Sequence, residues 1–168
     1  MELLIVRHAI AEERDAFATT GRDDAERPLT SVGRRRFERG ARGLRRIAPR
    51  IELLATSTLA RAVETGGILQ EACEIGRVVR LRELAPTAAP EALVRWLRTQ
   101  RRRRVVAVVG HEPHLSRVIE HLLAGSRRGF VDLKKGGACL LDLGDDPKAA
   151  TATLRWLVTA AQLRKLRG

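Results

Sequence analysis

The chain has 168 residues, of which 44% are hydrophobic and 31% are charged, as in a globular protein that buries a sizeable core. Its 32 Lys and Arg outnumber its 20 Asp and Glu, and the net charge of +12 predicts attraction to anions: phosphorylated groups, nucleic acid or acidic protein surfaces. Aromatic residues make up only 3%, which argues against platforms that stack single-stranded bases, though not against a groove that follows phosphates.

The first part of the chain predicts a strand, a loop and a helix. Residues 2–6 are an apolar run typical of a buried strand, and the polar residues 9–29 indicate a long loop. A helix is expected within residues 28–48, capped by Thr30 or Ser31, although three glycines weaken this prediction. Its apolar residues at helical spacing are Phe37, Ala41, Leu44 and Ile47.

The rest of the chain continues the alternation and then changes pattern. Strands are expected at 50–57, 77–81 and 104–110, and helices at 58–73, 90–100 and 112–125. The helix over 58–73 would carry Leu59, Val63 and Ile68 on one face. Two further strands, 137–144 and 152–160, could pair, and residues 161–168 are expected to form a basic tail.

Strands that alternate with helices predict an α/β fold, here a three-layer α/β/α sandwich around a mostly parallel central sheet. No linker divides the chain, so residues 1–168 are expected to form a single domain.

The cysteines and the apolar runs indicate the cellular compartment in which the protein is expected. Cys73 and Cys139 are distant from each other and form no CxxC or Cys/His cluster, so we expect buried, inert thiols and no zinc site. No apolar run approaches the ~20 residues of a membrane span, and Met1 leads directly into a strand. The expected location is the cytoplasm.

Polar residues follow the carboxyl ends of the predicted strands, where ligands bind in parallel α/β sheets. These residues are Arg7, His8, Thr56, Ser57, Arg61, Arg82, Glu83 and His111. A core would place apolar groups at such positions, so two histidines, several arginines and a carboxylate at one rim indicate a site.

The chemistry suited to this set is phosphoryl transfer. A neutral His8, with Nδ1–H bonded to a backbone carbonyl, could attack phosphorus through Nε2. Arginines bind phosphate oxygens in pairs and supply positive charge, and Glu83 is a candidate proton donor for the leaving group. Water would then hydrolyse the phosphohistidine, and the scheme requires no metal or other cofactor.

Four segments in this order resemble the histidine phosphatase superfamily, whose fold is phosphoglycerate mutase-like. They are VRHA, TSTLARAVETG, LRELAP and VVGHEPHLS, within residues 3–145. The length and the segments RPLTSVG, ELAP and LKKGGACLLDL are most similar to the small SixA type of phosphohistidine phosphatase.

The resemblance implies a role for each matching residue. His8 would be the phosphorylated nucleophile, and Arg7, Arg61 and His111 would hold the phosphate. Arg27 is similar to an additional phosphate-contacting arginine of the SixA type.

The proton donor is less settled in the SixA type. Glu83 matches the acid of many relatives, with Asp23 or Asp24 as the competing choice. The family most often has Gly after the histidine, so Ala9 would be strained if that position requires a positive φ.

Other polar residues have open interpretations. His114 lies close enough to the rim to matter, whereas His121 is expected to be structural or solvent-facing. Lys134 and Lys135 form either a solvated turn or an electrostatic rim. The run Arg101–Arg104 precedes a strand and falls on the side opposite the site, as a solvated patch or a docking surface for an acidic partner.

The sequence is compatible with three functions. The connections at 82–90 and 110–113 are too short to contain insertions that would enclose the site. An open site favours a phosphate carried on a protein, such as a histidine-containing phosphotransfer protein in signalling. A phosphatase for small phosphate esters is the second hypothesis. The third is a non-enzymatic basic protein that binds nucleic acid or polyphosphate, which the scarcity of aromatics and the set of catalytic residue types disfavour.

Overall fold

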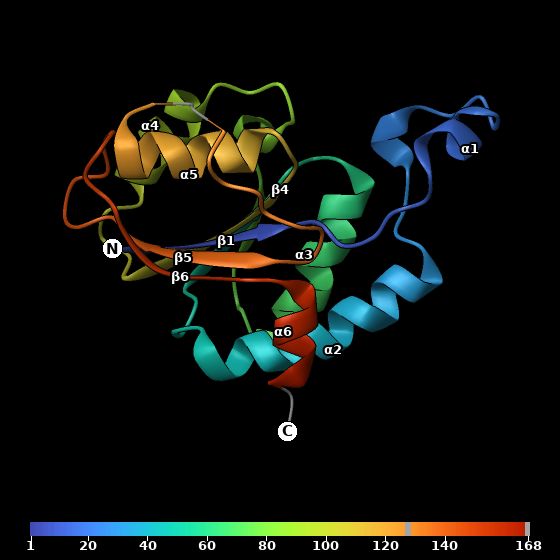
Figure 1. Ribbon diagram of the computed structural model, residues 1–168, viewed down its shortest axis with the longest axis horizontal. Helices are drawn as coiled ribbons and strands as arrows, with labels where there is room; N and C mark the ends of the chain where they lie inside the picture. The colour runs from blue at the N-terminus through green and yellow to red at the C-terminus, as the bar shows by residue number, and fades with distance from the viewer. Residues whose placement is uncertain (127–128, 167–168) are drawn as a thin grey trace.

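The computed structural model describes residues 1–126 and 129–166, which form three layers around one six-stranded sheet (Figure 1). The strand order is β3-β2-β4-β1-β5-β6. The strands are β1 (Glu2–Arg7), β2 (Leu53–Thr56), β3 (Val78–Arg80), β4 (Val105–Gly110), β5 (Ala138–Asp142) and β6 (Thr153–Val158). β1 to β4 pair in parallel, whereas β5 pairs antiparallel with both β1 and β6. The predicted α/β sandwich and the pairing of the last two strands are confirmed.

Helices cover both faces of the sheet (Figure 1). They are α1 (Arg14–Ala18), α2 (Ser31–Ile47), α3 (Ala60–Cys73), α4 (Pro90–Thr99), α5 (His114–Ala124) and α6 (Ala160–Lys165), with short 3₁₀ turns η1 (Asp24–Glu26) and η2 (Arg82–Leu84). Alternate residues of β1 supply the two cores: Leu4 and Val6 pack toward α2, α3 and α6, and Leu3 and Ile5 toward α4 and α5. Such two-sided burial explains the uninterrupted apolar run of β1.

The glycines of α2 allow close packing. Thr30 caps the helix by accepting a hydrogen bond from the Gly33 amide at 2.8 Å, as predicted. A Cβ on Gly33 would lie 2.0 Å from the Ile10 carbonyl oxygen, and one on Gly43 would lie 1.9 Å from the Leu163 carbonyl oxygen. The glycines that weakened the helix prediction are therefore the points at which two other segments approach α2.

The predicted face of α3 is right for Ile68, which is buried, and wrong for the other two residues. Leu59 and Val63 are only half-buried, and the buried residues of the helix are Arg61, Ala62, Thr65, Gly66, Ile68 and Leu69. A Cβ on Gly66 would lie 2.3 Å from the Thr56 side chain, so the helix packs on β2 through small residues. The small residues and Arg61 on the buried face weaken the apolar periodicity of the helix.

The chain end corrects another prediction. In place of the basic tail expected over residues 161–168, the helix α6 begins at Ala160, and residues 167–168 lie outside the described part. Thr159 and Gln162 form a capping box, and Leu163 is fully buried against α2. The reciprocal cap and one buried leucine stabilise a helix too short for periodicity to reveal.

The two thiols differ in burial. Cys139 is buried, as expected, and burial raises its pKa to about 12. Cys73 is only half-buried, contrary to prediction, because it ends α3 at the surface. Within residues 1–126 and 129–166, no helix is long and apolar enough to cross a membrane.

Candidate active site

Two histidines meet where β1 and β4 end. The strands are adjacent and parallel, with Arg7 opposite Gly110, so the residues that follow them lie side by side. The rings of His8 and His111 have centroids 5.0 Å apart and planes tilted by 51°. The His8 amide also donates to the Gly110 carbonyl at 3.0 Å, which fixes the backbone of one histidine against the other strand.

The ring of His8 is held in one neutral form. Its Nδ1 lies 2.7 Å from the Ala9 carbonyl oxygen, and because a carbonyl only accepts, Nδ1 carries the proton. Burial, together with the charges of Arg61, Arg7 and Lys135, lowers the pKa of His8 to about 4 against the opposing effect of the Ala9 bond. At neutral pH, Nε2 therefore holds a free lone pair, as the reaction scheme requires.

His111 is buried without a hydrogen-bond partner on either ring nitrogen in the described part of the chain. Burial, with smaller contributions from His8 and Arg61, lowers its pKa to about 2. Buried polar groups are ordinarily bonded, so an unpartnered ring at a strand end indicates a place for a ligand.

Two arginines present similarly unsatisfied donors. Arg7 donates to the Leu133 carbonyl at 2.9 Å, and Arg61, only 2% exposed, donates to the Asp24 carbonyl at 2.9 Å. The Nε of each is buried without a partner among the described residues. Leaving a buried donor unpaired costs about 1–3 kcal/mol, a cost that a bound oxyanion would offset.

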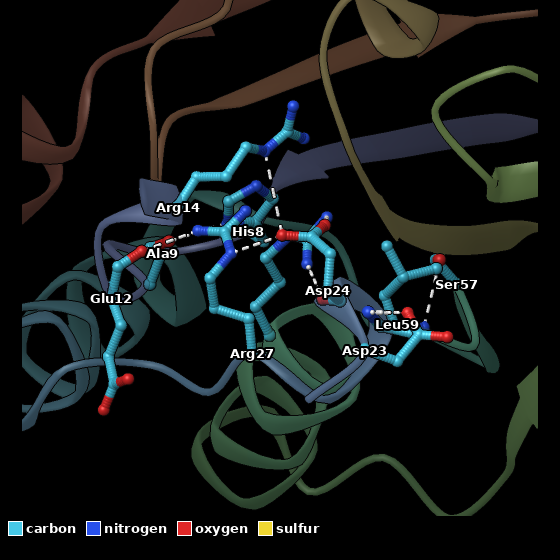
Figure 2. Close-up of polar contacts among 11 residues, drawn as sticks. His8, Ala9, Glu12, Arg14, Asp23, Asp24, Arg27, Ser57 and Leu59 are labelled. Atoms are coloured by element: carbon cyan, nitrogen blue, oxygen red, sulfur yellow. Dashed lines mark hydrogen bonds and ion pairs between the residues drawn. The ribbon is translucent and has the colours of Figure 1, made fainter. Parts of the chain in front are cut away.

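Asp24 joins three arginines beside His8 (Figure 2). Its carboxylate accepts from Arg27 Nε at 2.7 Å, and it lies 3.2 Å from Arg61 Nη2 and 3.7 Å from Arg14 Nε. The hydrogen bond from Arg27, together with the charge of Arg61, lowers the pKa of Asp24. Arg27 is thereby buried close to Arg61, with which it shares Asp24.

Ala9 is not strained. The non-glycine residues with positive φ in the described part of the chain are Glu74 and Ala150, so Ala9 adopts a backbone open to any residue. Its amide donates to Thr65 Oγ1 at 3.0 Å, and the Thr65 hydroxyl donates to the Arg61 carbonyl at 2.6 Å. This bridge ties the loop after β1 to the helix that carries Arg61.

The sequence and this geometry both match a known family. The sequence model of the histidine phosphatase superfamily (branch 1) matches residues 3–88. An uncharacterized protein of Picosynechococcus sp. (strain ATCC 27264 / PCC 7002 / PR-6) is 34% identical over 140 residues, which cover 82% of each chain. The chain belongs to the histidine phosphatase superfamily.

Solved structures of other phosphatases share the fold. The histidine phosphatase SixA in complex with tungstate superposes with a TM-score of 0.83 at 21% identity, covering 97% of this chain and 99% of that one. An alpha-ribazole phosphatase from Shigella flexneri gives 0.74 at 17% identity over 95% and 97%. A mycobacterial glucosyl-3-phosphoglycerate phosphatase gives 0.70 at 16% over 94% and 98%. The fold is thus phosphoglycerate mutase-like, as predicted, and together with the family match it supports a phosphatase.

Within this superfamily fold, most of the candidate residues gather at one place. His8, His111, Arg7, Arg61 and Arg27 are linked by the contacts above. Glu83 is half-buried in η2, and it has no hydrogen bond or ion pair among residues 1–126 and 129–166. The Leu84 carbonyl lies 3.4 Å from a Cβ built on Gly110, so η2 adjoins the residue before His111.

Asp23, His114 and His121 are the remaining candidates, and the charge of His114 contributes to the lowered pKa of His111. Asp23 is exposed, and its side chain accepts from the Ala25 amide to cap η1. His114 is fully buried at the start of α5, where burial lowers its pKa to about 4. His121, further along α5, has its Nδ1 3.9 Å from Oε1 of Glu91 in α4.

Two residues near the site carry no clear signal in the sequence. Thr65 is recognisable only in retrospect, from its place one helical turn after Arg61. Glu112 follows His111 directly; it is half-buried, its Oε1 has no partner in the described chain, and burial raises its pKa. Glu112 does follow the end of β4, but a single carboxylate after His111 carries no further pattern that marks it.

Proposed function

We propose that this protein is a metal-independent phosphatase that removes phosphate from phosphohistidine on a signalling or phosphotransfer protein. The observation that carries the proposal is His8, held neutral with Nε2 free beside Arg7, Arg61 and His111. A neutral imidazole is a competent nucleophile, and the unsatisfied donors suit the oxygens of a transferring phosphoryl group.

The reaction has two steps. The Nε2 lone pair of His8 forms a bond to phosphorus while the bond from phosphorus to the leaving nitrogen breaks, and that nitrogen leaves with its electron pair and takes a proton. Water then attacks the phosphohistidine, the P–Nε2 bond breaks, and orthophosphate is released. The Nδ1–H bond to Ala9 supports the positive charge that develops on the ring in the first step.

Glu83 is the proton donor in this proposal. Asp24 is poorly suited, because the bond from Arg27 lowers its pKa and favours the charged carboxylate. Asp23 is engaged in capping η1. A P–N bond to a protonated imidazole needs little further help, so the donor matters more for an ester than for phosphohistidine.

Small phosphate esters are the second candidate substrate class. The structures that share the fold include an alpha-ribazole phosphatase and a glucosyl-3-phosphoglycerate phosphatase. SixA, the protein histidine phosphatase with the same fold, was solved in complex with tungstate, a tetrahedral oxyanion. The short connection between β4 and α5 favours a protein-borne phosphate, because it leaves the histidines without a covering insertion.

The test is phosphate release, with a chelator present, from a phosphorylated histidine-containing phosphotransfer domain and from p-nitrophenyl phosphate. Wild type should act on the domain more efficiently, and His8→Ala should lose activity on both by a factor of about 10³ or more. His121→Ala is the matched control and should stay near wild type. Equal rates for wild type and His8→Ala would refute the nucleophile, and preference for the ester would select the second class.

A further inference from the structure

A groove beside His8 carries positive charge on its rim and apolar side chains on its floor. It has a volume of about 590 Å³ and begins at Arg7 and Ala9, the two neighbours of His8 in the chain. It extends between α2, the turn at 134–136 and α6, which lies alongside α2 beneath the sheet (Figure 1). The groove therefore adjoins the candidate active site, with which it shares Arg7.

The floor of the groove is apolar. Ile10, Phe37, Ala160 and Ala161 line it, and Phe37 is 3% exposed, so its ring forms a fixed surface. Gly136 adopts a φ of +69° in the adjoining turn, and a Cβ there would lie 3.3 Å from Ala160 and 3.4 Å from Phe37. A side chain at position 136 would thus crowd the groove, and glycine keeps it open.

The rim is cationic, with no carboxylate among the lining residues. Its charges are Arg7, Arg36, Lys134, Lys135 and Arg164. Lys134 forms an ion pair with Asp132, whereas Arg36, Lys135 and Arg164 have no ion pair among residues 1–126 and 129–166. Lys135 also acts on His8 itself, because its charge lowers the pKa of that ring.

We infer that this cationic groove docks an acidic segment of the phosphorylated protein substrate, with carboxylates on the rim and an apolar side chain on the floor. The inference rests on the proposed function. The five cations of the groove exceed what one phosphoryl group can pair with, and only Arg7 among them belongs to the candidate active site. Phosphate binding also leaves the apolar floor unused, whereas a protein segment offers both kinds of contact.

The test compares two double variants of equal charge change. Arg36→Glu/Arg164→Glu alters the rim, whereas Arg35→Glu/Arg39→Glu alters exposed residues of α2 that do not line the groove. Each is assayed at about 0.15 M ionic strength with an acidic phosphotransfer domain phosphorylated on histidine, and with p-nitrophenyl phosphate. The small substrate reports folding and the intact chemistry of each variant.

The rim variant should lose about tenfold or more in kcat/KM on the phosphorylated domain, mainly through KM, and keep its rate on p-nitrophenyl phosphate. The control variant should remain within about twofold on both substrates. Equal losses in the two variants would show general charge attraction and overturn the inference. A loss of p-nitrophenyl phosphate turnover in the rim variant alone would also overturn it, because the rim would then serve the phosphate.

Failure of the proposed function gives a different pattern. Wild type would then release no phosphate from the domain while turning over p-nitrophenyl phosphate, and the docking inference would be overturned with it. If wild type does act on the domain and the rim variant matches wild type, only the docking inference is overturned.

Discussion

Arginines are abundant at both ends of the parallel strands, which are called here the carboxyl edge and the amino edge of the sheet. The environments of these arginines differ between the two edges. At the carboxyl edge, Arg61 is 2% exposed, and Arg7 and Arg61 each keep a buried Nε without a partner in the described chain. At the amino edge, a cavity of about 810 Å³ is lined by exposed or half-buried charges of both signs. These are Arg50, Arg77, Arg103 and Arg104 with Glu2, Glu52 and Glu74.

The difference shows that the number of charges says little about function. Mixed charges in water satisfy one another or the solvent, and they contribute little to stability or binding. Buried donors without acceptors cost free energy, so their presence at one edge indicates that a ligand completes them. Cationic residues that contribute to the net charge of +12 lie at both edges. At the carboxyl edge they lie around histidines that are neutral at pH 7.

Removing one arginine from each edge gives the largest expected contrast. Arg61→Gln should lower kcat/KM for phosphate release by about 10²–10³, the usual cost of losing one charge-stabilising donor. Arg104→Gln, at the amino edge, should change it by less than about twofold. Steady-state kinetics on the phosphorylated domain measure both variants, and comparable losses in the two would erase the distinction between the edges.

Glu83 tests whether the carboxyl edge also supplies a proton. Glu83→Gln should reduce kcat on an alkyl phosphate by about 10²-fold, because an alkoxide leaving group needs an acid. On phosphohistidine the loss should stay below about tenfold, since that leaving nitrogen is readily protonated. Glu91→Gln on α4 serves as the control for a carboxylate removed elsewhere. An unchanged rate on the alkyl ester would exclude Glu83 as the donor.

Acid should destabilise the carboxyl edge in particular. The folded protein holds His8 and His114 at pKa values of about 4 and His111 at about 2, below the ordinary 6.5. As the pH falls below 6.5, the unfolded chain therefore binds more protons than the folded one. The free energy of unfolding should then decrease as the pH falls toward about 4, by at most about 1.4 kcal/mol per pH unit for each histidine.

Urea unfolding at about pH 7, 6 and 5 measures this decrease. His111→Gln removes one of the three histidines and should flatten the pH dependence relative to wild type, while the carboxylates common to both proteins contribute equally. A variant whose slope equals that of wild type would contradict the burial of a neutral His111.

Two glycine substitutions give the smallest expected effects, with opposite signs. Gly43→Ala should lower the free energy of unfolding by about 1–3 kcal/mol, because its Cβ would lie 1.9 Å from the Leu163 carbonyl of α6. Gly67→Ala, on a helix position with nothing within 4 Å, should raise it by about 0.5–1 kcal/mol. Thermal unfolding measures both effects. Stabilisation by Gly43→Ala would contradict the close packing of α6 on α2 at Gly43, beside the cationic groove.

Some features are predictable because they depend on local sequence. β1 and β4 are apolar runs that need burial on both faces, and parallel strands bring the residues after them to one edge. The placement of His8 and His111 at the same edge thus follows from the sequence, whereas their proximity depends on the pairing of β1 with β4 in the folded sheet. The bond from His8 Nδ1 to a backbone carbonyl also follows from the chemistry, although only the folded chain identifies Ala9 as the acceptor.

Other features are not predictable because they depend on distant contacts. α6 is too short to show periodicity, and it is stabilised by its cap and by Leu163 packing on α2. The buried face of α3 combines Ile68 and Leu69 with small residues and Arg61, so hydropathy detects it only in part. Asp24 carries no sequence signal that distinguishes it from Asp23, and only the folded loop brings it to three arginines.

The sequence by itself determined the strands and the four longer helices in chain order, and the residues that follow the strand ends, because hydrophobic periodicity is a local property. The tertiary structure decided which of those residues are buried, which donors lack partners, and how α2 and α6 enclose the cationic groove. Burial and pairing depend on segments far apart in the chain, such as those of Gly43 and Leu163, and no local pattern encodes their approach.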